Sequence, residues 1–501
     1  MKVLRFLAVL LLLGRIAPAN DLSDDLTARR ARVMERLGPN AMLVLKSAPV
    51  RNYSLDVDYE YRQDSNFYYL TGITQPGTTL VLMPGNTTRR EILFISPRDP
   101  VQEHWTGHVI TREDAIARTG IQTVLTSPQF EPFLQAMLTR QASGGVSAAD
   151  AKAFFDALAA NRAVVALALE PPTLNDPPGP AMAFANQLRN RFVGFQIADL
   201  TPILSDLRIV KTPYERTLLI RSGVVSSAAQ MVGMQTANAG AYEYQVKAAI
   251  EAAQRSAGAE SWAYPSIVGS GPNATILHYS GSDRQMQTGD LLLVDAGASV
   301  QYAATDVTRT YPVSGTFTAA QRDIYSIVLR AQEEAAKIVA PGVLSNQIHT
   351  RTVEIIKEGL LALGLITDAR GEQYRMWYTH GATHYIGIDV HDVGDRNHPL
   401  QVGMAFTIEP GIYIRQTVLD ELPRTPENLA LIQRIQPAVT KYNNIGVRIE
   451  DSFLLEADGL KNLSASVPKT IEGIEQFLQA SGARQQAPGT TRPAAGSRDR
   501  N

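Results

Sequence analysis

The sequence LLLVDAGASVQYAATDVTRTY, residues 291–311, places two aspartates eleven positions apart. Asp295 follows four consecutive apolar residues, a pattern typical of a buried strand, and a buried carboxylate is costly unless a cation meets it. Asp306 lies in a second β-rich stretch, after a segment of Gly, Ala and Ser. A hairpin here would bring both acids onto neighbouring strands. Taken singly, either acid is more simply interpreted as a surface or turn residue.

Two more acids end apolar-rich segments. Glu409 follows MAFTI and precedes Pro410-Gly411, and Glu450 lies at the end of the alternating segment IGVRIE. A period of two places Arg448 and Glu450 on one face of a strand and the isoleucines on the other. An ordinary half-exposed strand is the alternative.

Four converging carboxylates would repel one another, and some would stay protonated unless a cation were present. Two Asp, two Glu and one His form a hard oxygen set with one imidazole, which suits Mn, Co, Fe or Zn. Five such ligands exceed the three that a catalytic zinc site commonly has. A pair of ions bridged by carboxylates, about 3.5–4 Å apart, fits this set better.

The segment HGATHYIGIDVHDVG, residues 380–394, holds three of the eight histidines, His380, His384 and His391. A zinc-binding helix of the HExxH type needs Glu directly after the first His, and Gly381 stands there instead. The glycines and the alternation of Ile386, Ile388 and Val390 favour strand and turn over helix. We therefore do not expect His380 and His384 to chelate a metal as a helical pair.

Length and composition set the class of protein. A chain of 501 residues predicts two or three domains, and 45% hydrophobic with 19% charged residues is ordinary for a globular protein. The formal charge of −2 gives no reason to expect nucleic-acid binding or an anionic membrane surface as partner. The absence of cysteine excludes disulfides, thiolate ligands and cysteine nucleophiles.

Residues 1–19 have the pattern of a secretory signal peptide. Lys2 and Arg5 precede an apolar run from Phe6 to Leu13, and Ala17-Pro18-Ala19 predicts cleavage after Ala19. The run is shorter than the roughly 20 residues that cross a bilayer. We expect an exported protein, periplasmic or secreted, with no membrane association after cleavage. A structural N-terminal helix is the alternative.

The rest of the chain divides into two domains and a tail. Residues 20–205 read as one helix, LTARRARVMERL, and several short strands, AMLVLKSA, NFYYLTGI, TTLVLMPG and EILFISPRD. Thr212, Pro213 and Glu215 form a strong helix start, so the boundary is expected near 205–212. In the second domain, residues 206–480, helices are expected near 214–235, 241–257, 318–340 and 344–364, and strands near 290–296, 304–311, 404–409 and 445–455. Residues 481–501 have few large apolar side chains, and we expect a disordered tail.

Five stretches together resemble the pita-bread metallopeptidases, and within them the Xaa-Pro aminopeptidases (aminopeptidase P). They are ILHYSG, LLLVDAGASVQYAATDVTRTYPVSGTFTAAQR, HGATHYIGIDVHDVG, FTIEPGIYI and IGVRIEDSFLL. The resemblance extends into the first domain through RQDSNFYYLTGI and VLMPG. It implies an α+β fold in which an N-terminal α/β (creatinase-like) domain precedes a C-terminal pita-bread catalytic domain.

The resemblance also implies a site and a reaction. The implied metal ligands are Asp295, Asp306, His384, Glu409 and Glu450, with the second Asp and the last Glu bridging two divalent ions. Mn2+ is the first choice, with Co2+, Zn2+ or Fe2+ as alternatives. The implied catalytic residues are His278, His391 and Glu409, and the implied substrate-side residues are His380 and Arg448, the latter also orienting the acids. The implied reaction is hydrolysis of the bond between an N-terminal residue and a following proline by a dinuclear metal-activated water. The implied partners are peptides with proline at the second position and further copies of the chain, as a dimer or tetramer.

Some features depart from the family or leave alternatives open. Residues 416–440 are longer than in many relatives and could narrow the entrance to the site, and Ser452 stands where the family usually has a second acid after Glu450. Trp105 matches a position where some relatives offer an aromatic to a neighbouring subunit; a partly exposed tryptophan without that role is the alternative. Prolidase, which acts on dipeptides only, is the nearest rival. Methionine aminopeptidase normally lacks a large first domain, and metal-free proteins on this scaffold have lost ligand acids.

Overall fold

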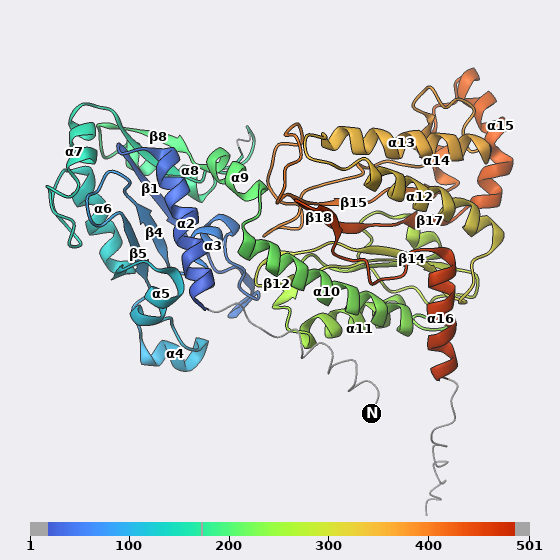
Figure 1. The fold of residues 1–501 in the computed structure, drawn as a ribbon, viewed down its shortest axis with the longest axis horizontal. Helices are drawn as coiled ribbons and strands as arrows, with labels where there is room; N and C mark the ends of the chain where they lie inside the picture. The colour runs from blue at the N-terminus through green and yellow to red at the C-terminus, as the bar shows by residue number, and fades with distance from the viewer. Residues whose placement is uncertain (1–18, 172–173, 486–501) are drawn as a thin grey trace, which may run out of the picture. The chain divides into compact units, whose positions relative to one another are not determined.

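The computed structural model describes residues 19–171 and 174–485 (Figure 1). The chain forms two compact units that divide after Tyr214, just beyond the expected boundary. The proposed signal peptide lies outside the described residues, except for Ala19 at the start of the first described helix. Among the described residues, no helix combines the length and apolarity needed to cross a membrane.

The first unit is built on a six-stranded mixed sheet with the order β6-β5-β4-β1-β7-β8. Its strands are β1 (Ala41–Lys46), β4 (Thr79–Leu82), β5 (Glu91–Ile95), β6 (Thr123–Thr126), β7 (Ala163–Leu167) and β8 (Phe195–Asp199). β4 runs antiparallel to both β1 and β5, whereas β1, β7 and β8 are parallel. β1, β4 and β7 are almost wholly buried because helices cover both faces, which explains their continuous apolar sequences. A small separate hairpin, β2 (Asn52–Ser54) and β3 (Val57–Asp58), is exposed.

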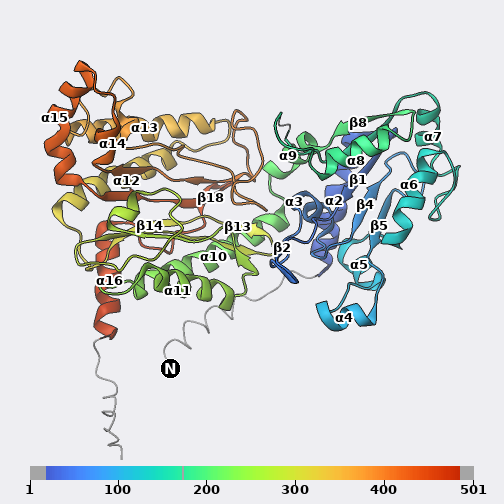
Figure 2. The same ribbon diagram turned by 180° about the vertical axis from the view of Figure 1, so that it is seen from behind.

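Helices cover both faces of this sheet. In Figures 1 and 2, α2 and α3 lie on one side of β1 and α6 and α7 on the other. The helices of the unit are α2 (Ala19–Leu37), α3 (Ser65–Thr71), α4 (Pro100–Thr106), α5 (Arg112–Thr119), α6 (Phe130–Leu138), α7 (Lys152–Ala159), α8 (Pro180–Arg189) and α9 (Thr201–Ile209). One core cluster joins side chains of α6, α7 and α8 to β1, β4, β5 and β7.

The expected strand at NFYYLTGI is wrong, because these residues form helix α3. Asp64 caps the helix by accepting a hydrogen bond from the Phe67 amide, and Gly72 ends it in the left-handed conformation at φ 63°. Four consecutive buried apolar residues look alike in a buried strand and in a buried helix, so periodicity could not separate the two. The other expected elements of this domain, the helix in 26–37 and the strands at 41–48, 78–85 and 91–99, are confirmed.

The second unit contains short, mostly antiparallel strands. They are β9 (Ser261–Trp262), β10 (Ile267–Ser270), β11 (Leu291–Asp295), β12 (Ala298–Val300), β13 (Ala303–Ala304), β14 (Thr308–Pro312), β15 (Ala405–Ile408), β16 (Gly411–Ile414), β17 (Ile445–Arg448), β18 (Asp451–Glu456) and β19 (Gly459–Asn462). They pair as β10-β11-β14, β13-β12-β9, β15-β18-β19 and β16-β17. Each expected strand of this domain is therefore present, although 304–311 and 445–455 are each interrupted.

Helices enclose these strands. α12 (Ala319–Lys337) and α13 (Ser345–Ala362) lie on one side, and α10 (Pro213–Thr236) and α11 (Glu243–Ser256) on the other (Figures 1 and 2). All four helices were expected, and α10 begins at Pro213 with Glu215 in its first turn. The α+β class is confirmed. The main core cluster of the unit joins the inner faces of α10 to α13 to the strands.

The segment 416–440 forms helices α14 (Thr417–Glu421) and α15 (Pro426–Tyr442). Leu419, Ile435 and Val439 are buried in the main core cluster of the second unit. These side chains give the segment a packing role, and its effect on the entrance to the site stays a prediction. At the other end of the unit, α16 (Ile471–Gln485) continues through residues 481–485 of the expected tail, and the rest of the tail lies outside the described residues.

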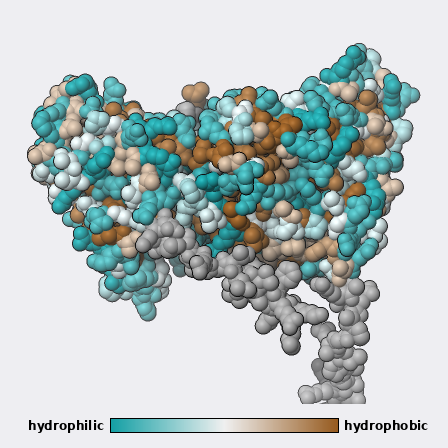
Figure 3. All heavy atoms as spheres, in the orientation of Figure 1, coloured by the Kyte–Doolittle hydropathy of each residue, from teal (hydrophilic) through white to brown (hydrophobic). Residues whose placement is uncertain are grey.

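Figure 3 shows a face that is mainly hydrophilic, with apolar residues gathered most densely in its upper middle part. Trp105 lies on α4 with 80% of its surface exposed. An exposed ring fits both interpretations of Trp105, with and without a contact to a neighbouring subunit.

Candidate metal centre

The two aspartates lie where the sequence predicted them, beside each other in the second unit. β11 and β14 are antiparallel, and Asp295, the last residue of β11, pairs with Thr308. Asp306 lies two residues before Thr308, in the interval between β13 and β14. The chain reverses through the β12–β13 pairing in between. The expected hairpin is therefore present, and it brings both carboxylates to one end of the sheet.

Glu409 and Glu450 reach the same place from two other strand ends. Glu409 follows β15, and Glu450 lies between β17 and β18, where its backbone amide donates to the Thr308 carbonyl at 3.1 Å. Arg448 and Glu450 are both buried, so this is not the half-exposed strand of the alternative interpretation. Both faces of the strand are covered.

The segment 380–394 forms no helix but an irregular stretch alongside β15. The Thr407 amide donates to the His384 carbonyl at 2.9 Å, and the Glu409 amide donates to the Ala382 carbonyl at 2.8 Å. The Nδ1 of His384 lies 3.1 Å from the carbonyl oxygen of Tyr385. A hydrogen bond from Nδ1–H to this oxygen leaves Nε2 free to act as a ligand.

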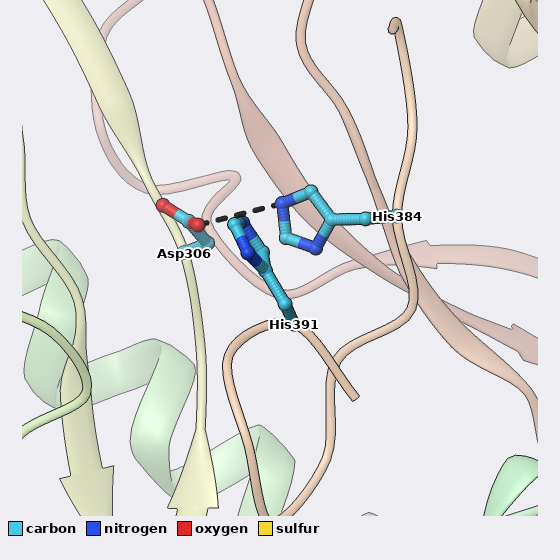
Figure 4. A group of neighbouring side chains, drawn as sticks. All are labelled: Asp306, His384 and His391. Atoms are coloured by element: carbon cyan, nitrogen blue, oxygen red, sulfur yellow. Dashed lines mark ion pairs between the residues drawn. The ribbon is translucent and has the colours of Figure 1, made fainter. Parts of the chain in front are cut away.

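The five expected ligands come together as overlapping sets. Ligand atoms of Asp295, Asp306 and Glu450 lie within 4.8 Å of one another, and so do those of His384, Glu409 and Glu450. His384 Nε2 is 3.5 Å from Asp306 Oδ2, 3.5 Å from Glu409 Oε1 and 3.6 Å from Glu450 Oε1. Glu450 belongs to both sets. Figure 4 shows the His384 ring pointing at Asp306, with His391 beside them.

The electrostatics of this cluster fit a cation site. Burial and the neighbouring Asp306 raise the pKa of Asp295 to about 6, and burial and Glu450 raise the pKa of Asp306 and of Glu409. Glu450 Oε1 is buried and has no hydrogen-bond partner among the described residues. Acids that repel one another, together with an unpartnered carboxylate oxygen facing an imidazole, are what a divalent ion would neutralise. The residues present therefore fit metal binding.

Arg448 lies behind the acids and orients two of them. Its Nη2 donates to Asp295 Oδ2 at 2.5 Å, and its Nε donates to Thr308 Oγ1 at 3.2 Å. Thr308 Oγ1 in turn donates to Glu450 Oε2 at 2.7 Å. Arg448 is buried. These contacts support the orienting role, and the substrate-side role of Arg448 stays a prediction.

His380 lies next to Glu409 and is joined to the acids through Tyr413 and Arg448. Arg448 Nη1 donates to the Tyr413 hydroxyl at 3.0 Å, and that hydroxyl contacts His380 Nε2 at 2.8 Å. His380 Nδ1 is 2.8 Å from the Gly381 carbonyl oxygen. Burial and the charge of Arg448 lower the pKa of His380 to about 3, so the ring is neutral. The distance of 3.8 Å from its Nδ1 to Glu409 Oε2 is therefore not a salt bridge.

His391 and His278 lie on the more open side of the cluster. The His391 ring is exposed and packs edge-on against His384, with 4.4 Å between ring centroids. It also joins Asp306 and His384 in a third set of close ligand atoms. His278 is exposed in the loop after the 3-10 turn Gly271–Thr275, near enough to act electrostatically on His380 and His391. Both histidines are placed to meet a ligand that arrives from solvent.

Three hydroxyl residues of the centre were not found from the sequence. Tyr264 contacts one oxygen of Asp295 and one of Asp306, and burial together with Asp295 raises its pKa well above the usual value. Tyr413 and Thr308 join Arg448 to His380 and to Glu450, as described above. The alternation in FTIEPGIYI gave a weak signal for Tyr413, because it follows Glu409 at an even spacing. No pattern in the sequence marked Tyr264.

Family models and relatives agree with this arrangement. Residues 218–457 match the model for metallopeptidase family M24, and residues 26–146 match the model for the aminopeptidase P N-terminal domain. The Xaa-Pro aminopeptidase of Haemophilus influenzae is 33% identical over 464 residues, which cover 91% of this chain and 97% of that protein. The chain belongs to the Xaa-Pro aminopeptidase family.

Other members of the family extend the likeness. The Xaa-Pro aminopeptidase of Escherichia coli is 32% identical over 91% of this chain and 98% of its own length. The structure of E. coli aminopeptidase P with the inhibitor Pro-Leu is similar to this chain with a TM-score of 0.77, 31% identity and coverage of 93% of this chain and 99% of that one. A zinc-substituted form of the E. coli enzyme in complex with product is similar at a TM-score of 0.76. These likenesses span both units.

Proposed function

We propose that this protein is a metal-dependent aminopeptidase that hydrolyses the bond between an N-terminal residue and a following proline. The observation that carries the proposal is the pair of overlapping ligand sets that share Glu450. Family membership and the names of the relatives support the choice of substrate. Prolidase, the rival raised by the sequence, is not favoured, because the relatives are named Xaa-Pro aminopeptidases.

The residues present would hold two ions. Asp295, Asp306 and Glu450 would hold one, and His384 and Glu409 would hold the other together with the shared carboxylates of Glu450 and Asp306. When bound, two such ions supply the charge that lowers the pKa of water and polarises the peptide carbonyl. We propose Mn2+ as the first candidate, with Co2+, Zn2+ and Fe2+ as alternatives, because hard oxygen ligands with one imidazole suit all four.

The chain's own residues do the remaining work. The proline nitrogen carries no hydrogen in the intact Xaa-Pro bond, so it must be protonated in order to leave as an amine. Among the four acids, Glu409 has the most exposed side chain, at 17%, which places its carboxyl where it can exchange a proton with a bound peptide. His391 and His278 flank the same open side and can donate N–H groups to the scissile carbonyl. Arg448, Thr308 and Tyr264 hold the acids in place.

The test is a series of peptides incubated with the purified protein. Arg-Pro-Pro-type peptides and matching Xaa-Pro dipeptides would be followed by chromatography, after stripping with chelator and again after adding Mn2+. We expect the longer peptides to lose one N-terminal residue only when metal is present. Cleavage of dipeptides alone would favour prolidase, and intact peptides under all conditions would reject the proposed activity.

We also propose that the protein is exported and that it forms a homo-oligomer. Export is supported by the charged start, the apolar run and the Ala17-Pro18-Ala19 site of residues 1–19. The oligomer is supported by the exposed Trp105 at a position where some relatives contact a neighbouring subunit. Mass determination of the mature N-terminus and light scattering would test the two points. A retained Met1 or a monomer at working concentration would contradict them.

A further inference from the structure

The strands that carry the two aspartates are interrupted where the acids lie. Residues 305–307 belong to neither β13 nor β14, and Asp306 is the middle one. Thr305 and Val307 bond across to Ala298 and Ala296 through backbone groups. These residues are all buried, so each backbone donor and acceptor needs a partner. The partner of the Asp306 backbone is a side chain and not the backbone of a neighbouring strand.

A single hydroxyl group binds both backbone groups of Asp306. The amide of Asp306 donates to Ser452 Oγ at 2.9 Å, and Ser452 Oγ donates to the Asp306 carbonyl at 2.7 Å. Ser452 lies on β18 and is fully buried. A hydroxyl both donates and accepts, whereas an ionised carboxylate at this position could only accept. Serine therefore suits the position better than the second acid that the family usually has there.

A row of polar side chains on α10 holds the same interval from the other side. Ser222, Ser226 and Gln230 are four residues apart, so they share one face of the helix, and all three are fully buried. We call these three residues the polar row. Polar groups on the inner face of a helix are costly unless they are hydrogen-bonded.

The polar row bonds to the backbone on both sides of the interruption. Ser222 Oγ donates to the Ala298 carbonyl at 2.8 Å, and Ser226 Oγ accepts from the Ala298 amide at 2.8 Å. Gln230 Nε2 donates to the Val307 carbonyl at 2.6 Å. Both serines also contact the Thr305 hydroxyl, at 3.1 Å and 2.8 Å. The row thus reaches the residues on each side of Asp306 and the turn that follows Asp295.

We propose that Ser452 and the polar row are positioning residues for the metal-binding acids. Ser452 replaces by side-chain hydrogen bonds the strand pairing that is missing at Asp306, and the polar row holds the residues on either side of it. Because the backbone of Asp306 is fixed from β18 and that of its neighbours from α10, its carboxylate is held towards Asp295 and Glu450. The inference rests on the proposed metal site and adds residues that bind neither metal nor substrate. A purely structural role would stabilise the fold without changing metal affinity.

The test measures Mn2+ binding to the metal-free full-length protein, without substrate. Ser452→Ala removes the hydroxyl and Gln230→Met keeps the shape of the side chain without its amide. Loss of an outer hydrogen-bonding partner commonly weakens metal binding by about 10–100-fold, and we expect this for both variants. Ser452→Thr retains the hydroxyl and should bind Mn2+ much as the unmodified protein does.

Gln321→Met is the matched control. Gln321 is also a buried glutamine that donates to a backbone carbonyl, that of Gly289 at 2.8 Å, beyond the end of β11 opposite Asp295. We expect it to lower the melting temperature without altering the Mn2+ dissociation constant.

Unchanged Mn2+ affinity in both Ser452→Ala and Gln230→Met would overturn the inference. If Ser452→Ala does not fold, Gln230→Met decides alone. Mn2+ binding without peptide cleavage in the unmodified protein would reject the proposed activity but not the positioning role.

Discussion

Replacing Asp451 by Asn should strongly destabilise the second unit, although Asp451 is not one of the proposed ligands. Its carboxylate accepts hydrogen bonds from Arg309 Nη2 at 2.6 Å, Ser464 Oγ at 2.7 Å and Lys469 Nζ at 2.8 Å. The side chains of Arg309 and Asp451 are both wholly inaccessible to solvent. Burial alone would raise the pKa of Asp451, but Arg309 and Lys469 hold it well below its usual range.

The magnitude follows from this burial. Asn keeps the shape of Asp but not its charge, so the guanidinium of Arg309 would remain buried without a counter-charge. Breaking such a buried pair costs about 3–5 kcal/mol of unfolding free energy. At about 2 °C per kcal/mol for a domain of this size, the melting temperature should fall by about 6–10 °C. Arg309 also donates to the Glu450 carbonyl at 2.7 Å, so the damage should reach the metal centre.

The assay is thermal unfolding followed by circular dichroism in excess chelator, so that metal binding does not contribute. The control is Glu358→Gln, which breaks an exposed ion pair with Arg330. The side chain of Arg330 is 52% exposed and that of Glu358 is 64% exposed. Exposed pairs contribute about 0–1 kcal/mol, so this control should shift the melting temperature little. Equal shifts for Asp451→Asn and Glu358→Gln would refute the assignment of the buried pair as a major source of stability.

Three further predictions concern the centre and its surroundings. Asp306→Asn should lower turnover by about 100-fold or more, because it removes the carboxylate proposed to bridge the two ions. In chelator the variant should melt no lower than the unmodified protein, since the cost of burying a charge and the repulsion by Glu450, which raise the pKa of Asp306, would be relieved. Near-normal turnover would contradict the bridging role. Tyr311→Phe should change the free energy of unfolding little, because the buried Tyr311 hydroxyl has no hydrogen-bond partner among the described residues. Tyr325→Phe should cost about 1 kcal/mol, because it loses a 2.7 Å hydrogen bond to the Lys469 carbonyl. Denaturant titration compares the two variants, and an equal loss of stability would contradict the assigned hydrogen bonding. Gly297→Ala should disrupt the turn after Asp295, because an added Cβ would lie 1.8 Å from the Thr305 carbonyl oxygen. Gly381→Ala is the control, because its added Cβ would meet no atom within 4 Å. Equal Mn2+ affinity and equal melting temperatures for the two variants would contradict the predicted disruption of the turn.

Much of the fold was predictable from the sequence, because its elements carry clear local signals. The helix start at Pro213 and the apolar runs before Asp295 and Glu409 lie in the structure as expected. The strand expected at NFYYLTGI failed because the signals that decide it, a cap at Asp64 and a left-handed Gly72, flank the apolar run and are separate from its pattern. The narrowed entrance suggested by the length of 416–440 stays a prediction, because the length of a segment does not indicate which of its faces is buried.

The candidate centre was predictable as a set of acids and histidines, but its supporting contacts were not. Asp, Glu and His at strand ends are conspicuous because charge is costly in a buried position. Tyr264 has no such mark, because a tyrosine between two carboxylates looks in sequence like any partly buried tyrosine. Serines and glutamines on α10 are similarly inconspicuous. Their role depends on which backbone groups lie opposite them, and only the folded chain shows that.

The interruption of the sheet explains why these polar residues are needed. In a regular antiparallel ladder, side chains alternate between the two faces, and their positions follow from the register. Asp295 ends a strand and Asp306 precedes one, so neither carboxylate is placed by a continuous ladder on both sides. Freedom from the ladder lets both acids turn toward one point, but it leaves backbone groups without strand partners. Ser452 binds the backbone groups of Asp306, and the polar row adds hydrogen bonds to the residues on either side, so the same hydrogen bonds that stabilise the interruption also fix the direction of the carboxylates.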